Sequence, residues 1–347
     1  MQAQAQTNNA RPEKKLWKVE LRKILDANCT RHAVKDKTVS ARTRRARHEV
    51  LFQCFTELRS DCEPKCKLDD PRHFREKHFE LLLALWLSKG LSSSTLQNRT
   101  SILRTFCTWI GRADMIKPLD TYVADKTLVR RVQVAQEDKS WTGNGLSFDE
   151  KLKEIDAYDL QAGAQLRIIK AFGLRREEAV CFRPNRARLL GADQNAIYVE
   201  FGTKNGLKRH VPIETEYQRE MLDYACRLAK TTEAHIGWED LSLKQAVKKI
   251  ANIMQKFKVT KKDAGATLHG LRHENMHDIH FDVTGHPVPV KGGKVEDMDP
   301  DLVLKARHKM TQAAGHARLG ITNAYAGSYK KPKKRLTLMG YMQSKVG

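Results

Sequence analysis

The chain has 347 residues, enough for two domains that each bury a core of their own. Its 63 lysine and arginine residues against 41 acidic residues give a formal charge of +22, which predicts a polyanionic partner such as nucleic acid or an anionic membrane. The longest apolar run, Leu81–Leu87, is too short to cross a bilayer, and the N-terminus lacks the apolar core of a signal peptide. We therefore exclude membrane insertion and export and expect a cytoplasmic protein.

The seven cysteines are an odd number and mostly fall inside apolar patterns, which favours reduced thiols over a disulfide framework. Cys62, Cys66, His73 and His78 have the chemistry of zinc ligands. Their C-x3-C spacing and the turn-like Glu63-Pro64-Lys65 between the cysteines favour an ordinary loop instead.

The first part of the chain is basic and helical in pattern. Residues 1–15 are polar, and we predict that they are disordered. A helix follows the dense basic stretch Ser40–Arg47, with apolar positions from Val50 to Leu58 on one face. A solvated helix face explains such a stretch as well as phosphate contact does, but the overall charge favours DNA. We predict DNA contacts from four side chains, Arg42, Arg44, Arg45 and Arg47.

Two more helices complete the predicted N-terminal domain. One runs from about His73 to Lys89 and stops at Gly90, and the next is capped within Ser92–Thr95. The polar side of this second helix carries Asn98 and Arg99, which we also predict to contact DNA. Residues 16–139 therefore form a predicted helical DNA-binding domain.

A second domain is predicted over residues 146–330, after the loop Ser140–Gly145. Ser147 is a helix cap with Glu150 three residues later. Ala196–Phe201 alternates like a strand, an Asn-Gly turn follows, and Arg209–Ile213 is the return strand before helices resume near Thr215. The predicted fold is thus mainly α with a small antiparallel β-sheet. Residues 331–347 form a basic C-terminal tail.

Six side chains of this second domain form a candidate catalytic set. In chain order they are Arg175, Lys204, His269, Arg272, His316 and Tyr325. Planar guanidinium groups can bind the non-bridging oxygens of a phosphodiester, a tyrosine can attack phosphorus, and a lysine or histidine can protonate the leaving oxygen. These residue types therefore suffice to cut DNA without a metal or another cofactor. Singly, each position also has an ordinary structural explanation, such as an Arg175–Glu178 surface pair.

One stretch supports two incompatible motifs. Read from His273 it is H-E-x-x-H, a zinc-protease motif with His277 as the second ligand, whereas His269 and Arg272 belong to H-x-L-R-H. The zinc interpretation needs a third ligand, and neither Glu296 nor Asp297 is fixed by any pattern. It also leaves the charge of +22 unexplained. We therefore predict that no metal is bound here.

The four motifs in this order resemble those of the tyrosine recombinases of the phage-integrase type. The matching segments are Gly173-Leu174-Arg175 with Glu178, the hairpin lysine Lys204, His269–His273, and Gly315-His316 with Tyr325 nine residues later. The segment before residue 140 is similar to the family's core-binding domain. One departure is the long separation of Arg272 from His316, which implies an insertion at about residues 281–300.

The resemblance implies a site-specific recombinase or integrase of a mobile genetic element, cytoplasmic and DNA-associated in a prokaryote. Tyr325 would form a 3′-phosphotyrosyl link, with Arg175, Arg272 and His316 on the phosphate, Lys204 as general acid and His269 exchanging a proton. The family also implies a two-domain clamp around attachment-site DNA, a tetramer on paired sites, a tail docked on a neighbouring protomer, and host or element-encoded DNA-bending or directionality factors. The alternatives are a type IB topoisomerase-like enzyme and a non-catalytic DNA-binding regulator of the same fold.

Overall fold

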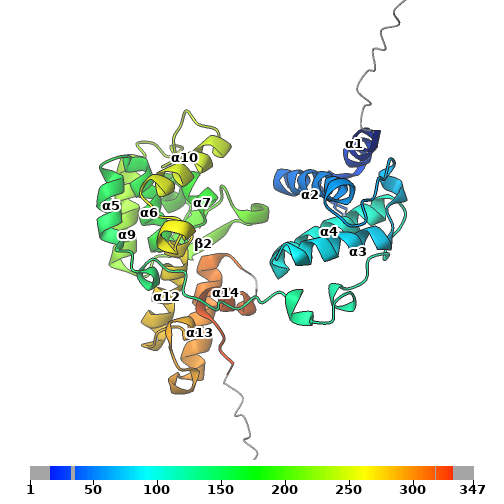
Figure 1. Cartoon of the computed structure of the whole chain (residues 1–347). Coiled ribbons are helices and arrows are strands. Elements are labelled where there is room, and N and C mark those ends of the chain that lie inside the picture. The colour runs from blue at the N-terminus through cyan, green and yellow to red at the C-terminus, as the bar shows by residue number, and fades with distance from the viewer. Residues whose placement is uncertain (1–15, 33–35, 317, 331–347) are drawn as a thin grey trace, which may run out of the picture. The chain divides into compact units, whose positions relative to one another are not determined.

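The computed structural model describes residues 16–32, 36–316 and 318–330. The chain divides into two compact units between Val132 and Gln133 (Figure 1). The predicted disordered segment 1–15 and the predicted tail 331–347 lie outside the described residues. Among the helices that are described, none combines the length and apolar character needed to span a membrane.

The regular secondary structure described in the first unit is helical, apart from an isolated β-bridge between Arg31 and Thr38. Its α-helices are α1 (Leu16–Asn28), α2 (Ala41–Ser60), α3 (Glu76–Ser88) and α4 (Ser93–Trp109), and its 3-10 turns are Pro71–His73, Leu119–Thr121 and Lys126–Leu128. Ser40 and Ser92 cap α2 and α4 through their hydroxyls. Helix α2 packs against the other three helices (Figure 1). In the core between them, Phe55 makes edge contacts with Phe74 and Phe106.

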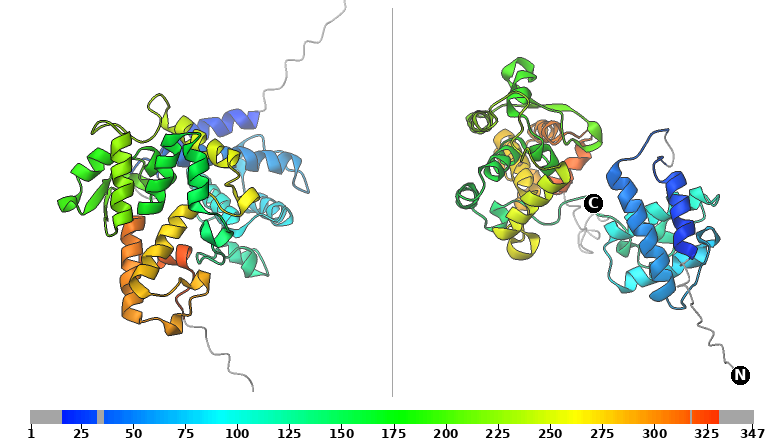
Figure 2. Two further views of the ribbon diagram at one scale, coloured as in Figure 1. Left: turned by 90° about the vertical axis from the view of Figure 1, so that its left-hand side faces the viewer. Right: turned by 90° about the horizontal axis from the view of Figure 1, so that it is seen from above.

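The second unit contains ten α-helices within the described residues. They are α5 (Phe148–Asp156), α6 (Leu160–Phe172), α7 (Arg176–Val180), α8 (Pro184–Leu189), α9 (Glu216–Leu228), α10 (Leu243–Lys256), α11 (Lys261–Ala264), α12 (Gly270–Thr284), α13 (Pro300–Ala314) and α14 (Asn323–Ala326). Helix α12 packs against α6, α13 and α14, and Figure 2 shows α13 beside it. The hydroxyl of Ser147 caps α5, as predicted. Trp141 is completely buried, so the stretch before α5 belongs to the core of this unit.

Two short antiparallel strands form the sheet, which confirms the predicted fold class. β1 (Ala196–Val199) pairs with β2 (Arg209–Pro212), and Val199 lies opposite Arg209. The predicted Asn-Gly turn is present in part: Asn205 and Gly206 have φ values of 60° and 68°. The connection is longer than a two-residue hairpin, however, because the ladder ends at Val199 and a 3-10 turn occupies Lys204–Gly206. Lys204 is therefore carried on the loop between the two strands.

The segment predicted as an insertion is a packed connection. Helix α12 ends at Gly285, and 3-10 turns at Pro289–Lys291 and Val295–Asp297 lead to α13. Val288 is completely buried in this connection. A Cβ on Gly327, at the end of α14, would lie 2.9 Å from the Val290 nitrogen. The connection thus supports the short helix that carries Tyr325.

Candidate active site

Arg272 lies at the centre of the candidate site and is completely buried. Its guanidinium group donates to the carbonyl of Gly173, to the carbonyl of Ala314 at 2.6 Å, and through Nε to the hydroxyl of Tyr325 at 3.0 Å. A buried charge is tolerated only with such partners. Helix α12 begins with Gly270, and this glycine lets the start of the helix lie against the backbone of Lys139. A Cβ at position 270 would lie 2.5 Å from the Lys139 carbonyl oxygen.

Arg175 is held beside Arg272 by a carboxylate and a shared carbonyl. Gly173 ends α6 at a φ of 60°, which turns the chain so that Arg175 caps α7. The Arg175 Nη1 donates to Glu178 Oε1 at 2.7 Å, and its Nη2 donates to the Ala314 oxygen at 2.9 Å. The Ala314 carbonyl therefore accepts from both arginines, and the two guanidinium groups lie close together.

Arg209, the first residue of β2, is a third arginine of the site that sequence reasoning missed. Its Nη1 and Nη2 each donate to one oxygen of Glu178 at 2.8 Å. Burial by itself raises the pKa of the Glu178 carboxyl, but the hydrogen bonds and charge of Arg209, with those of Arg175, outweigh burial and lower the pKa to about 2. One signal was available: Arg209 shares a strand face with buried Val211, and a charge on a buried face needs a partner.

Tyr325 is buried, with 7% of its surface exposed, and its ring is surrounded by histidines. Ring centroids lie 4.9 Å away for His273, 6.3 Å for His269 and 6.4 Å for His316. The His277 Nε2 lies 3.0 Å from the Tyr325 carbonyl oxygen. Arg307 holds the preceding residues, because it donates to the Thr322 hydroxyl and the Leu319 carbonyl. The hydroxyl is thereby fixed against Arg272.

The two histidines of the predicted set are neutral near pH 7. Burial of the ring and the charges of Arg272 and Arg175 lower the pKa of His269 to about 4. Burial and the charges of Arg175, Arg272 and Lys204 lower the pKa of His316 to about 4 as well. Lys204 is itself exposed on its loop. Five of the six predicted residues thus converge, and the charge of the sixth, Lys204, acts on His316 from the loop.

The H-E-x-x-H residues serve packing in this structure. The Glu274 carboxylate accepts from the backbone N–H groups of Trp141 at 3.1 Å and Thr142 at 3.3 Å. The rings of His269, His273 and His277 form a row of edge contacts, with centroids 5.2 Å apart for the first pair and 6.3 Å apart for the second. Within the described ranges, there is no group of three or more histidine, cysteine, aspartate or glutamate side chains that could hold a metal ion. Cys62, Cys66, His73 and His78 of the first unit therefore do not form such a group either.

Tyr329 occupies a different environment from Tyr325. Its hydroxyl is buried without a hydrogen-bond partner among the described residues, and burial raises its pKa. Its ring lies 4.9 Å from the Arg307 guanidinium and 5.7 Å from the His280 ring. Tyr329 is thus a packing residue behind the segment that carries Tyr325. The third C-terminal tyrosine, Tyr341, lies outside the described residues.

The residues predicted to contact DNA divide into two groups. Arg42, Arg44, Arg45 and Asn98 are exposed. Arg47 is buried, and its Nη1 donates to the carbonyls of Cys29 and Arg31 at 2.8 Å each. The Arg99 guanidinium lies over the Trp86 ring at 5.2 Å and pairs with Glu57 at 3.3 Å. The guanidinium groups of Arg47 and Arg99 are therefore bonded to other residues of the same unit, and this arrangement does not favour the DNA contacts predicted for them.

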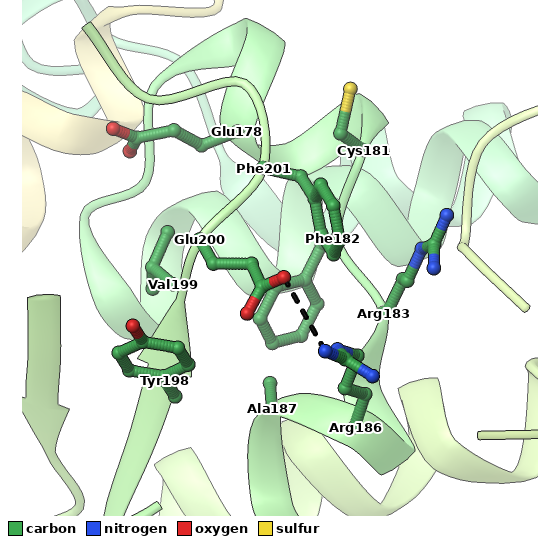
Figure 3. A pocket seen from close by; sticks show the side chains of 10 residues that line it. All are labelled: Glu178, Cys181, Phe182, Arg183, Arg186, Ala187, Tyr198, Val199, Glu200 and Phe201. Atoms are coloured by element: carbon green, nitrogen blue, oxygen red, sulfur yellow. Dashed lines mark ion pairs between the residues drawn. The ribbon is translucent and has the colours of Figure 1, made fainter. Parts of the chain in front are cut away.

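A small pocket lies beside the site, between α7, α8 and the strand β1 (Figure 3). An ion pair of 3.6 Å between Arg186 and Glu200 crosses it. Figure 3 shows the Glu178 carboxylate pointing away from this ion pair. The pocket is therefore behind the arginine cluster and contains none of the six predicted catalytic side chains.

Two family models match the chain. The model described as integrase matches residues 135–281, and that described as phage integrase, N-terminal, matches residues 25–116. No curated protein matches the sequence. A lambda integrase dimer bound to a COC′ core site is similar in structure, with a TM-score of 0.55, 11% identity, and coverage of 92% of this chain and 99% of that one.

Two further solved structures share the fold. XerH site-specific recombinase bound to a palindromic difH substrate gives a TM-score of 0.51 at 14% identity, covering 96% of this chain and 98% of that one. The Tn1549 transposon integrase in complex with transposon right end DNA gives 0.50 at 14%, covering 88% and 93%. Together with the family models and the converging side chains, these matches establish that the chain belongs to the tyrosine recombinase family of DNA-recombining enzymes.

Proposed function

We propose that this enzyme is the site-specific recombinase, or integrase, of a mobile genetic element, and that it cuts and rejoins duplex DNA through a 3′-phosphotyrosyl intermediate. One observation carries the proposal: the Tyr325 hydroxyl accepts a 3.0 Å hydrogen bond from the completely buried Arg272. The only tyrosine hydroxyl bonded to this guanidinium among the described residues is thus within reach of any phosphate that the two arginines bind. Positioning of this kind is a large part of catalysis in phosphoryl transfer.

In the cleavage step the Tyr325 oxygen attacks the scissile phosphorus. The bond from phosphorus to the 5′ oxygen breaks as the bond to the tyrosine forms, and Lys204 gives the leaving oxygen a proton. His269 accepts the tyrosine proton, which it can do because its pKa of about 4 leaves it neutral near pH 7. Arg175, Arg272 and His316 stabilise the charge on the non-bridging oxygens.

In the rejoining step a 5′-hydroxyl from a partner strand attacks the phosphotyrosyl phosphorus and releases Tyr325. The two phosphodiester-type bonds are alike in energy, so the exchange balances without a nucleotide cofactor or a metal ion. Attack by the original strand instead would give the topoisomerase-like alternative. Strand exchange between two duplexes therefore separates a recombinase from a nicking-closing enzyme.

DNA binding would rest on the charge of +22 and on the exposed side chains of the first unit, Arg42, Arg44, Arg45 and Asn98. Assembly as a tetramer on paired attachment sites is supported by the lambda integrase tetramer bound to a Holliday junction, which has a TM-score of 0.53 to this chain. DNA-bending or directionality factors from the host or the element would act on this assembly, in the cytoplasm of a prokaryote.

A covalent capture experiment tests the proposal. The protein is incubated with sheared genomic DNA of its source organism, denatured in detergent, and precipitated so that only covalently attached DNA is recovered and sequenced. Wild type should recover a defined sequence, and a nicked duplex carrying that sequence should give a slow band on a denaturing gel. Tyr325→Phe should give no band, and Tyr329→Phe should resemble wild type. Specific binding without a covalent band in wild type would instead identify a regulator.

A further inference from the structure

We propose that Arg209 is a positioning residue of the recombination site, which sets the geometry of Arg175 through Glu178 and through the turn that contains Ala314, without contacting DNA itself. This inference rests on the proposed function. Arg209 begins β2, opposite Val199, and its side chain is 9% exposed. The evidence is the hydrogen bonds that its guanidinium group donates to two partners, the Glu178 carboxylate and the Ala313 carbonyl.

The first partner of Arg209 is the Glu178 carboxylate, which also binds Arg175. Glu178 is completely buried, and both of its oxygens receive a bond of 2.8 Å from Arg209. The same oxygens accept from the Arg175 side chain at 2.7 Å and from its backbone N–H at 2.8 Å. Two parallel bonds from one planar group fix the plane of the carboxylate. The direction of the Arg175 guanidinium is therefore set through Glu178.

On the other side Arg209 supports the turn that ends α13. Its Nε donates to the Ala313 carbonyl at 3.3 Å. Gly315 has a φ of 61°, and a Cβ there would lie 2.7 Å from the Arg209 Cδ. The neighbouring Ala314 carbonyl is the acceptor that Arg175 and Arg272 share. Arg209 thus contacts both supports of the arginine pair, the carboxylate and the turn.

The geometry of the Arg209 guanidinium group, and not only its charge, holds Glu178 and the turn in place. A lysine would keep the positive charge next to Glu178 but would replace two parallel bonds and the Nε bond by a single ammonium. A displacement of about 1 Å at a reacting group can cost about a hundredfold in rate. Arg209→Lys should therefore slow cleavage by about tenfold to a hundredfold while leaving DNA affinity within about twofold.

The test is a double-mutant cycle on single-turnover cleavage of the nicked duplex at saturating enzyme. The proteins are wild type, Arg209→Lys, Arg175→Ala and the double variant. If Arg209 acts through Arg175, adding Arg209→Lys to Arg175→Ala should slow cleavage by less than about threefold. Arg188→Lys is the matched control, because Arg188 pairs with Asp223 on the same unit away from the site. It should cleave like wild type.

The inference is overturned if Arg209→Lys cleaves within twofold of wild type, or if the two substitutions multiply in the double variant, as a general structural defect would. If Arg209→Lys does not fold, Arg209→Gln, which retains one donor, replaces it in the same cycle with the same criteria. An absence of covalent adduct in the wild type would refute the proposed function instead, so the two failures are distinguishable.

Discussion

The arginines at the start of α2 in the first unit and those of the candidate site in the second unit lie in different surroundings. At the start of α2 in the first unit, Arg42, Arg44 and Arg45 are exposed. In the second unit, the guanidinium groups of Arg175, Arg209 and Arg272 are bonded to Glu178 and to the carbonyls of residues 173, 313 and 314. An exposed arginine contributes charge at a distance, whereas a buried one contributes a fixed direction. The positive charge of +22 therefore includes exposed arginines, whose charge reaches solvent, and arginines whose guanidinium groups are bonded inside the protein.

The sharpest test of this comparison is Arg272→Ala. The substitution removes the group bonded to the Gly173 and Ala314 carbonyls and to the Tyr325 hydroxyl. Cleavage should fall by about a thousandfold or more. Because buried acceptors lose their donor, the free energy of unfolding should also fall by roughly 2–4 kcal/mol. Single-turnover cleavage and urea unfolding measure the two effects, and Arg44→Ala is the control that should change neither by much.

Acid should destabilise the protein through the buried histidines of the second unit. Burial and the charges of its neighbours lower the pKa of His273 to about 3, from an ordinary value near 6.5. Between these values the unfolded chain binds a proton that the folded chain does not, so stability is retained above pH 6.5 and falls as the pH drops toward 3. The slope from this residue is up to about 1.4 kcal/mol per pH unit.

Urea unfolding from pH 7 to pH 4.5 measures this effect. His273→Gln should flatten the dependence of the unfolding free energy on pH, and His308→Gln, at an exposed position on α13, should leave it unchanged. Equal slopes for wild type and His273→Gln would show that His273 does not contribute to the acid sensitivity.

The exposed arginines of the first unit should act on DNA affinity alone. Replacing Arg42, Arg44 and Arg45 together by glutamine should reduce the slope of log K against log salt by up to about 2.7, since each phosphate contact contributes about 0.9. Cleavage at saturating enzyme should be unchanged. Arg47→Gln should do the opposite: an unchanged salt slope, and a loss of roughly 1–3 kcal/mol in stability because the carbonyls of Cys29 and Arg31 lose their donor. Filter binding across a salt series distinguishes the two classes.

The smallest effect is expected for Tyr329→Phe. The hydroxyl removed is buried and has no hydrogen-bond partner among the described residues, so its loss should leave stability unchanged or slightly higher. Covalent adduct formation should stay within about twofold of wild type. A strong loss of adduct would show that Tyr329 belongs to the catalytic machinery and that the assignment of Tyr325 is wrong.

Residue types and their local spacing were sufficient to predict helix starts and to identify the candidate catalytic motifs in their order. The hydroxyls of Ser92 and Ser147 cap the two helices whose starts were predicted near them. The hydroxyl of Ser40 caps α2 as well, so this helix contains the basic stretch that was predicted to precede it. A cap depends on residues within one turn, so it can be recognised from sequence. The candidate set from Arg175 to Tyr325 was likewise identified by residue type, order and spacing, and the structure brings five of the six side chains together.

Whether an individual charged side chain is exposed or is buried and bonded was decided only by the tertiary structure. Arg44 and Arg47 stand in one basic run, yet a carbonyl pair from the preceding segment 29–31 binds only Arg47. Glu274 completes a zinc-protease motif in sequence, but backbone amides 133 and 132 residues away bind its carboxylate. Arg209 begins a short strand, and its bonds to Glu178 depend on the tertiary fold, which brings the two side chains together from positions 31 residues apart. Burial and pairing of charges depend on which distant segments meet, and a local pattern carries no information about that.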